Sequence, residues 1–175
     1  MERPQETEYA AFYTNYVSLT KGSDLNKILD DNLSETKGFF NSISETNAEV
    51  KYAEGKWNTK EILQHLLDAE RIFTYRALRF ARNDATELAG FEENDYAREA
   101  ETKHLKLGEL IEEFIFVRQA TKCLFRNFDE EKMTRIGTAN KNKMSVRAIG
   151  YVIAGHTQHH INVVRERYLP IFKIN

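Results

Sequence analysis

The sequence predicts an all-α protein that folds as a four-helix bundle with a long crossover connection, and three observations lead to this fold class. The chain of 175 residues has only two prolines, Pro4 and Pro170, so nothing between them forbids a helix. Four long segments carry apolar residues at steps of three and four, the spacing of one helix face. Most glycines fall where that spacing stops. Four such amphipathic helices bury their apolar faces together, which predicts a single domain over residues 1–175.

The first part of the chain is expected to form an arm and one long helix. Residues 1–22 contain several aromatic side chains before a break at Gly22, and they predict an N-terminal arm with a short helical turn that packs on the body. After Ser23 or Asp24 as N-cap, apolar residues recur at helical spacing until about residues 45–47. This stretch is the first of the four predicted helices.

The second and third predicted helices are separated by the longest connection. Asn58 is a good N-cap, and Glu61 stands three residues later in the position of a capping box, so a helix is expected over residues 58–82. Residues 83–95 are largely polar and too many for a tight turn, so this connection is expected to cross the bundle. The third helix is predicted over residues 103–128.

The last part of the chain combines a polar stretch with the fourth predicted helix. Residues 129–144 predict a turn or a small hairpin over one end of the bundle. Ser145 is expected to cap the fourth helix, which carries apolar residues at helical spacing until Pro170 ends it. Cys123, at an apolar position of the third helix, is interpreted as a core residue.

Composition and charge argue against several classes of protein. A net charge of -2 gives no basic surface for a phosphate backbone, so no nucleic acid partner is expected. No apolar run approaches the roughly 20 residues that span a bilayer, so no membrane association is expected. The first residues do not resemble a secretory signal and the single Cys123 cannot form an internal disulfide, so a cytoplasmic location is expected.

Two histidines four residues apart are the strongest candidates for a functional site. His156 and His160 lie one turn apart on one helix face, where two imidazoles can bind a divalent metal of the zinc, nickel or copper kind. His65 is the candidate third ligand, because it is the only other histidine in a strongly apolar helical run. A metalloprotease motif is excluded, since Thr157 stands where the general-base glutamate belongs. The alternative is a metal-free bundle with a polar patch in its core.

Two segments of the chain resemble a known family. Residues 57–71, WNTKEILQHLLDAER, are similar to the second helix of the DinB-like (DinB/YfiT) superfamily, and residues 145–170 are similar to its fourth helix. The resemblance covers nearly the whole chain. It implies a four-helix bundle that holds one metal through His65, His156 and His160. It also implies a homodimer, and an activity as a metal-dependent hydrolase or a thiol-dependent S-transferase.

A centre with three protein ligands leaves at least one coordination position open, which is typical of a catalytic site. The metal, expected to be zinc or nickel, can activate water or a low-molecular-weight thiol for reaction with a small-molecule substrate. The alternative function is a non-catalytic binding or stress-response module in which the metal holds two helices together.

Charged residues on the same helices are candidates for supporting roles. Glu61 and Asp68 flank the third candidate ligand and can orient its imidazole, or they can be solvated charges on the helix surface. Arg76 lies three turns further along the same stripe, and Arg147 belongs to a basic group that can approach the site; both are candidates for contact with a substrate anion. The alternative for Arg76 is an ion pair with a carboxylate such as Glu70.

Overall fold

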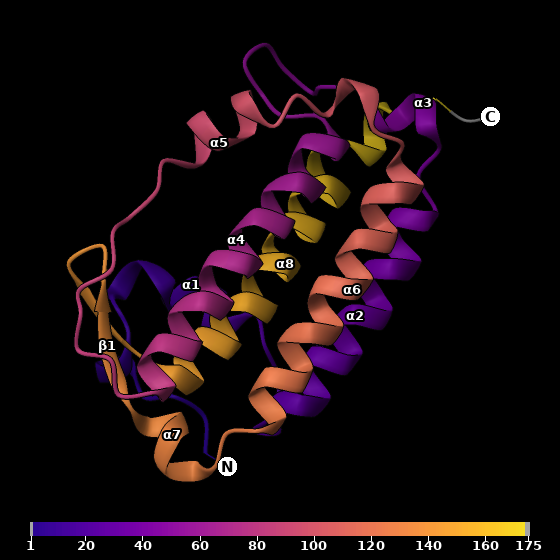
Figure 1. The fold of residues 1–175 in the computed structure, drawn as a ribbon. Helices are drawn as coiled ribbons and strands as arrows, with labels where there is room; N and C mark the ends of the chain where they lie inside the picture. Colours follow the sequence, from indigo (N-terminus) through magenta and orange to yellow (C-terminus); the bar gives the residue numbers. More distant parts are fainter. Residues whose placement is uncertain (1, 174–175) are drawn as a thin grey trace.

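Four long helices form the body of the structure (Figure 1). The computed structural model describes residues 2–173. The long helices are α2 (Leu25–Asn41), α4 (Thr59–Ala81), α6 (Leu107–Arg126) and α8 (Val146–Arg167). Both α2 and α4 pack against α6 and against α8. The predicted all-α four-helix bundle is confirmed.

The four helices do not simply alternate in direction. The starts of α4 and α6 lie side by side, because Lys60 donates a hydrogen bond to the Leu105 carbonyl, 2.8 Å away, just ahead of α6. The same end holds α3 (Glu45–Ala48), which follows α2, and the Leu107 amide of α6 donates to Glu45 at 3.0 Å. The helices α4 and α6 therefore run parallel to each other, while α2 and α8 run the opposite way (Figure 1).

The chain between α4 and α6 has to return along the whole length of the bundle, because these helices are parallel. Residues 82–106 make this return, and they contain α5 (Glu93–Glu99) and the 3-10 turn η3 (Thr102–His104). The predicted long crossover connection is confirmed. Figure 1 shows α5 on the side of α4, toward the end of the bundle at which α4 begins.

Local capping sets where the long helices begin. Asn58 Oδ1 accepts a hydrogen bond from the Glu61 amide at 2.9 Å, and the Glu61 carboxylate accepts one from the Asn58 amide at 2.7 Å, so the predicted capping box is confirmed. Ser145 caps α8, as predicted. The third long helix begins later than residue 103, at Leu107, because the Glu109 carboxylate accepts a hydrogen bond from the Lys106 amide at 3.0 Å.

The N-terminal arm rests on α8. It consists of η1 (Glu6–Glu8), η2 (Ala11–Tyr13) and α1 (Thr14–Ser18). The helix α1 packs along α8, and Gly155 makes this close approach possible, since a Cβ there would lie 1.8 Å from the carbonyl oxygen of Tyr16. A larger residue would push α1 away from α8.

Short elements close the two ends of the bundle. The elements after α6 are α7 (Glu130–Thr134) and an antiparallel hairpin of β1 (Ile136–Ala139) and β2 (Asn142–Ser145). A hairpin was one of the two structures expected in this stretch, and α7 precedes it. At the opposite end, Ser44 caps α3, so the predicted first helix is divided into α2 and α3 and does not run unbroken to residues 45–47.

A polar layer divides the core into two apolar clusters. One cluster contacts the arm and the hairpin, and the other surrounds α3 and the ends of α2 and α8. Between them one buried polar residue from each long helix joins a hydrogen-bond network, and these residues are Asn32, Glu70, Arg118 and Thr157. The Arg118 guanidinium binds the Glu70 carboxylate at 2.7 and 2.9 Å and the Thr157 hydroxyl at 3.0 Å. The partner of Glu70 is therefore Arg118, and the predicted alternative of an ion pair between Arg76 and Glu70 is wrong.

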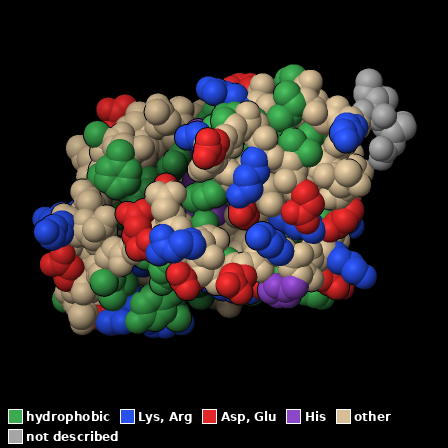
Figure 2. Space-filling view, turned by 90° about the horizontal axis from the view of Figure 1, so that it is seen from above, with side chains coloured by type: hydrophobic (Ala, Val, Ile, Leu, Met, Phe, Trp, Pro, Cys, Tyr) green, Lys and Arg blue, Asp and Glu red, His purple; other side chains and the backbone are tan. Residues whose placement is uncertain are grey.

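The outer surface carries both signs of charge. Figure 2 shows basic and acidic side chains interspersed over the face seen from above, with apolar side chains between them. No helix among residues 2–173 is both long enough and apolar enough to traverse a lipid bilayer.

Candidate metal centre

Three histidines meet between α4 and α8. His65 lies in the second turn of α4, and His156 and His160 lie on successive turns of α8. Nε2 of His156 lies 3.0 Å from Nε2 of His65 and 3.1 Å from Nε2 of His160. One nitrogen of each ring lies within 4.8 Å of the other two. The cluster of three histidines that the sequence predicted is present.

Burial keeps the three imidazoles neutral. The side chains of His65 and His156 are almost entirely removed from solvent. Loss of hydration lowers the pKa of His65 to about 4. Burial also lowers the pKa of His156 and His160 well below its ordinary value, and the neighbouring imidazoles lower it further. Each ring therefore keeps an unprotonated nitrogen near neutral pH, the form that binds a metal.

Hydrogen bonds alone do not satisfy this cluster. A neutral imidazole has one N–H donor and one lone pair, yet Nε2 of His156 faces two other Nε2 atoms. The buried Nδ1 of His160 has no partner among residues 2–173. A tetrahedral zinc ion with bonds of about 2.0–2.1 Å places its nitrogen ligands roughly 3.3 Å apart. The two separations at His156 are close to this spacing, and all three nitrogens lie within 4.8 Å of one another, so the donor set fits a divalent metal.

Aromatic side chains wall the cluster on two sides. The Trp57 ring lies 4.8 Å from that of His65 and stacks on His160 at 6.4 Å. On the other side the Tyr16 ring packs edge-on against His156 at 5.2 Å. Tyr16 reaches this position because Gly155 lets α1 contact α8. The arm of the chain thus completes the wall of the histidine cluster.

Two cavities reach the histidines, one beside His65 and His156 and the other beside His160. The first, of about 290 Å³, is lined by His65 and His156 together with Phe12, Tyr13, Tyr16, Ala69, Phe73, Arg76, Phe91, Glu92, Glu93 and Asn140. The second, of about 240 Å³, is lined by His160, with Trp57 and Tyr168 among its walls. The first turn of α5 contributes Glu93 to the first cavity and the next residue to the second. A metal at the cluster would be accessible from both.

Glu93 is a site residue that sequence analysis did not find. Its carboxylate lies 3.9 Å from Nε2 of His65, and its negative charge raises the pKa of the Tyr16 hydroxyl, which burial raises more strongly. Glu93 belongs to the connection after α4, where no hydrophobic periodicity reports the position of a side chain. Only the path of that connection brings it to the histidines.

The two carboxylates expected to orient His65 have other partners. Glu61 is bonded to Asn58 in the capping box and forms an ion pair with Lys51 at 2.8 Å. Asp68 accepts a hydrogen bond from Gln64 at 3.0 Å, and burial raises its pKa. Neither carboxylate is hydrogen-bonded to His65.

The two arginines considered for an anion lie in different places. Arg76 lines the first cavity, on the same side as His65. Arg147 lies in the first turn of α8, far along the helix from His160, and binds Glu8 of the arm, with its Nε 2.8 Å from the carboxylate. It does not line either cavity at the histidines.

The prediction that Cys123 is a core residue is wrong, because its side chain is exposed on α6.

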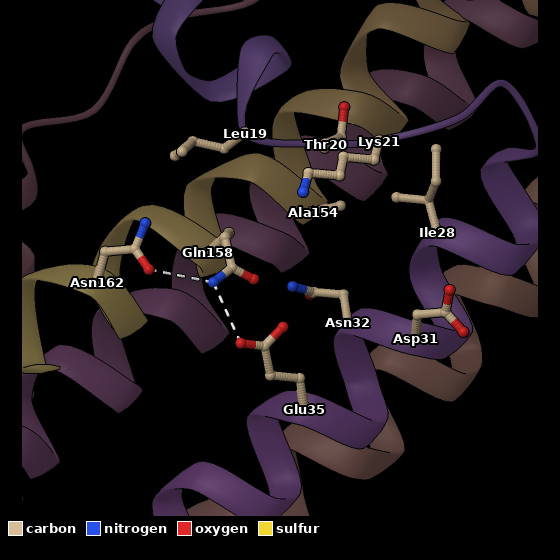
Figure 3. A pocket seen from close by; sticks show the side chains of 10 residues that line it. All are labelled: Leu19, Thr20, Lys21, Ile28, Asp31, Asn32, Glu35, Ala154, Gln158 and Asn162. Carbon is tan, nitrogen blue, oxygen red and sulfur yellow. Dashed lines mark hydrogen bonds between the residues drawn. The ribbon is translucent and has the colours of Figure 1, made fainter.

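A cavity larger than either of the two beside the histidines lies away from them. It measures about 420 Å³ and opens between α2 and α8 beside the residues that follow α1 (Figure 3). The Gln158 amide donates across it to Glu35 of α2 at 3.3 Å, and along α8 to Asn162 at 3.2 Å. None of the three clustered histidines lines this cavity, so size alone does not locate the candidate site.

Comparison with known proteins assigns the family. The model of the DinB superfamily matches residues 28–164, a span that contains all three histidines. The chain belongs to the DinB superfamily. The resemblance predicted from the segments around His65 and His156 is therefore confirmed. A comparison with curated proteins finds no match.

The DinB fold is also recognised among solved structures. The chain is similar to YfiT from Bacillus subtilis, with 14% sequence identity and a TM-score of 0.73, over 94% of this chain and 90% of that one. YfiT is described as a probable metal-dependent hydrolase with an unusual four-helix bundle topology. At this level of identity the likeness establishes the shared fold.

Proposed function

We propose that this DinB-superfamily protein is a metal-dependent enzyme that holds one divalent ion through His65, His156 and His160. The observation that carries the proposal is the convergence of three neutral imidazoles from two helices, two of them buried and that of His160 half-buried, with two cavities that reach them. Imidazole nitrogens suit zinc and nickel, and these are the metals we propose. The description of YfiT as a probable metal-dependent hydrolase supports the same class of chemistry.

Three protein ligands leave a coordination position for a reactant, as in catalytic sites. A divalent metal bound there lowers the pKa of water or of a thiol, so that either becomes a nucleophile near neutral pH. The reaction is accordingly a hydrolysis or the transfer of a group to a low-molecular-weight thiol. Two separate cavities favour keeping thiol transfer as the second candidate, because they offer separate space to a thiol and to a small-molecule substrate.

Glu93 is the group best placed to accept a proton in this centre. Its carboxylate lies 3.9 Å from Nε2 of His65, and its side chain is 56% exposed, so it can pass a proton on to solvent. Trp57 and Tyr16 shield the imidazoles between the two cavities. In this proposal the three histidines bind the metal, and Glu93 acts as the base.

Elemental analysis of untagged protein tests the metal centre. One zinc or nickel per chain is expected in the wild type, and none in a variant with His65→Ala, His156→Ala and His160→Ala. His104→Ala is the matched control, because this histidine is exposed on η3. The metal proposal fails if the wild type binds no metal after incubation with zinc and nickel, or if the triple variant binds as much.

Activity is tested on the metal-loaded protein. Ester and amide hydrolysis and thiol transfer to an electrophile are assayed with the wild type and with Glu93→Gln. We expect one of these activities in the loaded wild type, none after chelation, and a fall of about 10²–10⁴-fold in kcat for Glu93→Gln. Full activity in the chelated protein would exclude a metal-dependent reaction.

A further inference from the structure

Arg76 is a buried charge without a counter-charge. Its side chain is 5% exposed and lines the 290 Å³ cavity beside the histidines. No carboxylate of residues 2–173 lies within ion-pair distance of it. Buried charges in proteins are normally paired, because burial of an unpaired ion is costly. Arg76 therefore differs from an arginine with a purely structural role, which would have a carboxylate partner when buried.

The hydrogen bonds of Arg76 are also incomplete. One guanidinium nitrogen donates to the Ala89 carbonyl at 3.0 Å, whereas the buried Nε has no acceptor among residues 2–173. The guanidinium lies over the Phe73 ring at 5.6 Å, and burial lowers its pKa, an effect that the neighbouring Tyr13 hydroxyl partly offsets. Arg118 of the same bundle has both Nε and Nη2 bonded to Glu70. The chain thus pairs the guanidinium of Arg118 fully and leaves that of Arg76, which faces a cavity, short of acceptors.

Aromatic rings line one part of the cavity around Arg76, and polar side chains line the rest. Its aromatic walls come from the arm, from α4 and from the connection after α4, and they are Phe12, Tyr13, Tyr16, Phe73 and Phe91. His65 and His156 line its other end. His65 and Arg76 are eleven residues apart on α4, so their Cα atoms are separated by roughly 16 Å along the helix axis. The volume of about 290 Å³ is near the lower end for ligand pockets and suits a small molecule.

The charges of the cavity favour a carboxylate over a phosphate. Glu92 and Glu93 also line it, and their negative charges disfavour a dianion. A carboxylate carries one negative charge and matches the fork of a guanidinium.

We propose that this cavity binds a small aryl or alkyl carboxylate, with the acid group on Arg76, the apolar body between the aromatic rings and the opposite end at the histidines. The assignment of this molecule as the substrate rests on the proposed function. The binding of the anion by Arg76 does not, because Arg76 is separate from the three histidines.

Binding of 3-phenylpropionate, compared with its uncharged amide 3-phenylpropionamide, tests the proposal. Both are titrated calorimetrically into the full chain, first metal-loaded and then chelated. In both states the acid is expected to bind at least tenfold more tightly than the amide. Arg76→Gln is expected to abolish this preference. Arg82→Gln, which removes an exposed charge at the end of the same helix, is expected to retain it.

The outcomes separate this proposal from the metal centre. If the acid and the amide bind equally to the chelated wild type, or if Arg76→Gln keeps the preference, the anion site is overturned. This also holds if the acid binds only to the metal-loaded protein, because the carboxylate is then a metal ligand. If the protein binds no metal but the preference depends on Arg76, the anion site stands and the proposed enzyme fails. The comparison of acid and amide in the wild type decides the matter even if Arg76→Gln does not fold.

Discussion

Arg118 binds Glu70 through two hydrogen bonds, of 2.7 and 2.9 Å, at the centre of the bundle. Arg118 is completely buried, and its remaining donors bind Asn32 and Thr157. One side chain from each long helix thus takes part in a single network. A buried ion pair of this kind contributes little net stability but is demanding in its geometry. Because Thr157 directly follows His156, the network fixes the position of α8 along α4 next to the histidine cluster.

Removing the charge of Glu70 is predicted to destabilise the protein strongly. Glu70→Gln has nearly the same shape but leaves the Arg118 charge buried without its partner. The expected loss is about 3–5 kcal/mol in the free energy of unfolding, measured by urea denaturation. Glu113→Gln removes a carboxylate from an exposed pair with Arg71 and is expected to cost less than about 1 kcal/mol. Equal losses in the two variants would contradict the proposed role of the network.

Features that depend on neighbours in the sequence could be predicted. The capping box of Asn58 and Glu61 and the cap of Ser145 involve residues three positions apart, so the starts of α4 and α8 follow from local chemistry. The pair of His156 and His160 likewise follows from the pitch of a helix. These local features determine where α4 and α8 begin, and they bring together two of the three clustered histidines.

Features that depend on the packing of distant segments could not be predicted. The partner of Glu70 is Arg118, 48 positions away, and helical periodicity does not show which buried charges meet. Glu93 reaches His65 only through the path of a connection without periodicity. Cys123 fits the apolar spacing of α6, but its side chain lies outside the buried face of that helix. Helical spacing shows which residues share a face, but it does not show where the buried face ends.

Gly155→Ala is predicted to detach the arm from α8. The added methyl group would lie 1.8 Å from the Tyr16 carbonyl oxygen, so α1 must move. A loss of about 1–3 kcal/mol in stability and faster hydrogen exchange of the α1 amides are expected. Gly38→Ala in α2 is the matched control, since a Cβ there meets nothing within 4 Å, and it should stabilise the protein by about 0.5–1 kcal/mol. Unchanged exchange in α1 would show that Gly155 does not seat the arm.

The metal-free protein is predicted to lose stability between pH 6.5 and about 4. The pKa of His65 is lowered to about 4 in the folded chain, whereas the unfolded chain has the ordinary value near 6.5. Above pH 6.5 both states are neutral, and as the pH falls below it the unfolded state takes up the proton first. The contribution of His65 is roughly 3 kcal/mol by pH 4, at about 1.4 kcal/mol per pH unit.

The matched variants isolate this titration. Urea denaturation at a series of pH values is compared for the chelated wild type, His65→Asn and the exposed control His104→Asn. The slope between pH 6.5 and 4 should be shallower in His65→Asn and unchanged in His104→Asn. Parallel profiles for the wild type and His65→Asn would mean that His65 is not buried in its neutral form.

Chelating the metal is predicted to lower the melting temperature without unfolding the bundle. The two apolar clusters and the network around Arg118 join all four long helices independently of the histidines. A metal at 100 times its Kd stabilises the folded state by about 2.7 kcal/mol, which for a chain of this length corresponds to a shift of about 5–10 °C. Circular dichroism should show native helix content in the chelated protein and a higher melting temperature when zinc or nickel is restored. His156→Ala should show no shift of the melting temperature with metal.

Loss of the helical signal on chelation would instead favour the alternative in which the metal is a structural clamp between α4 and α8. The open coordination position would then no longer indicate a catalytic site.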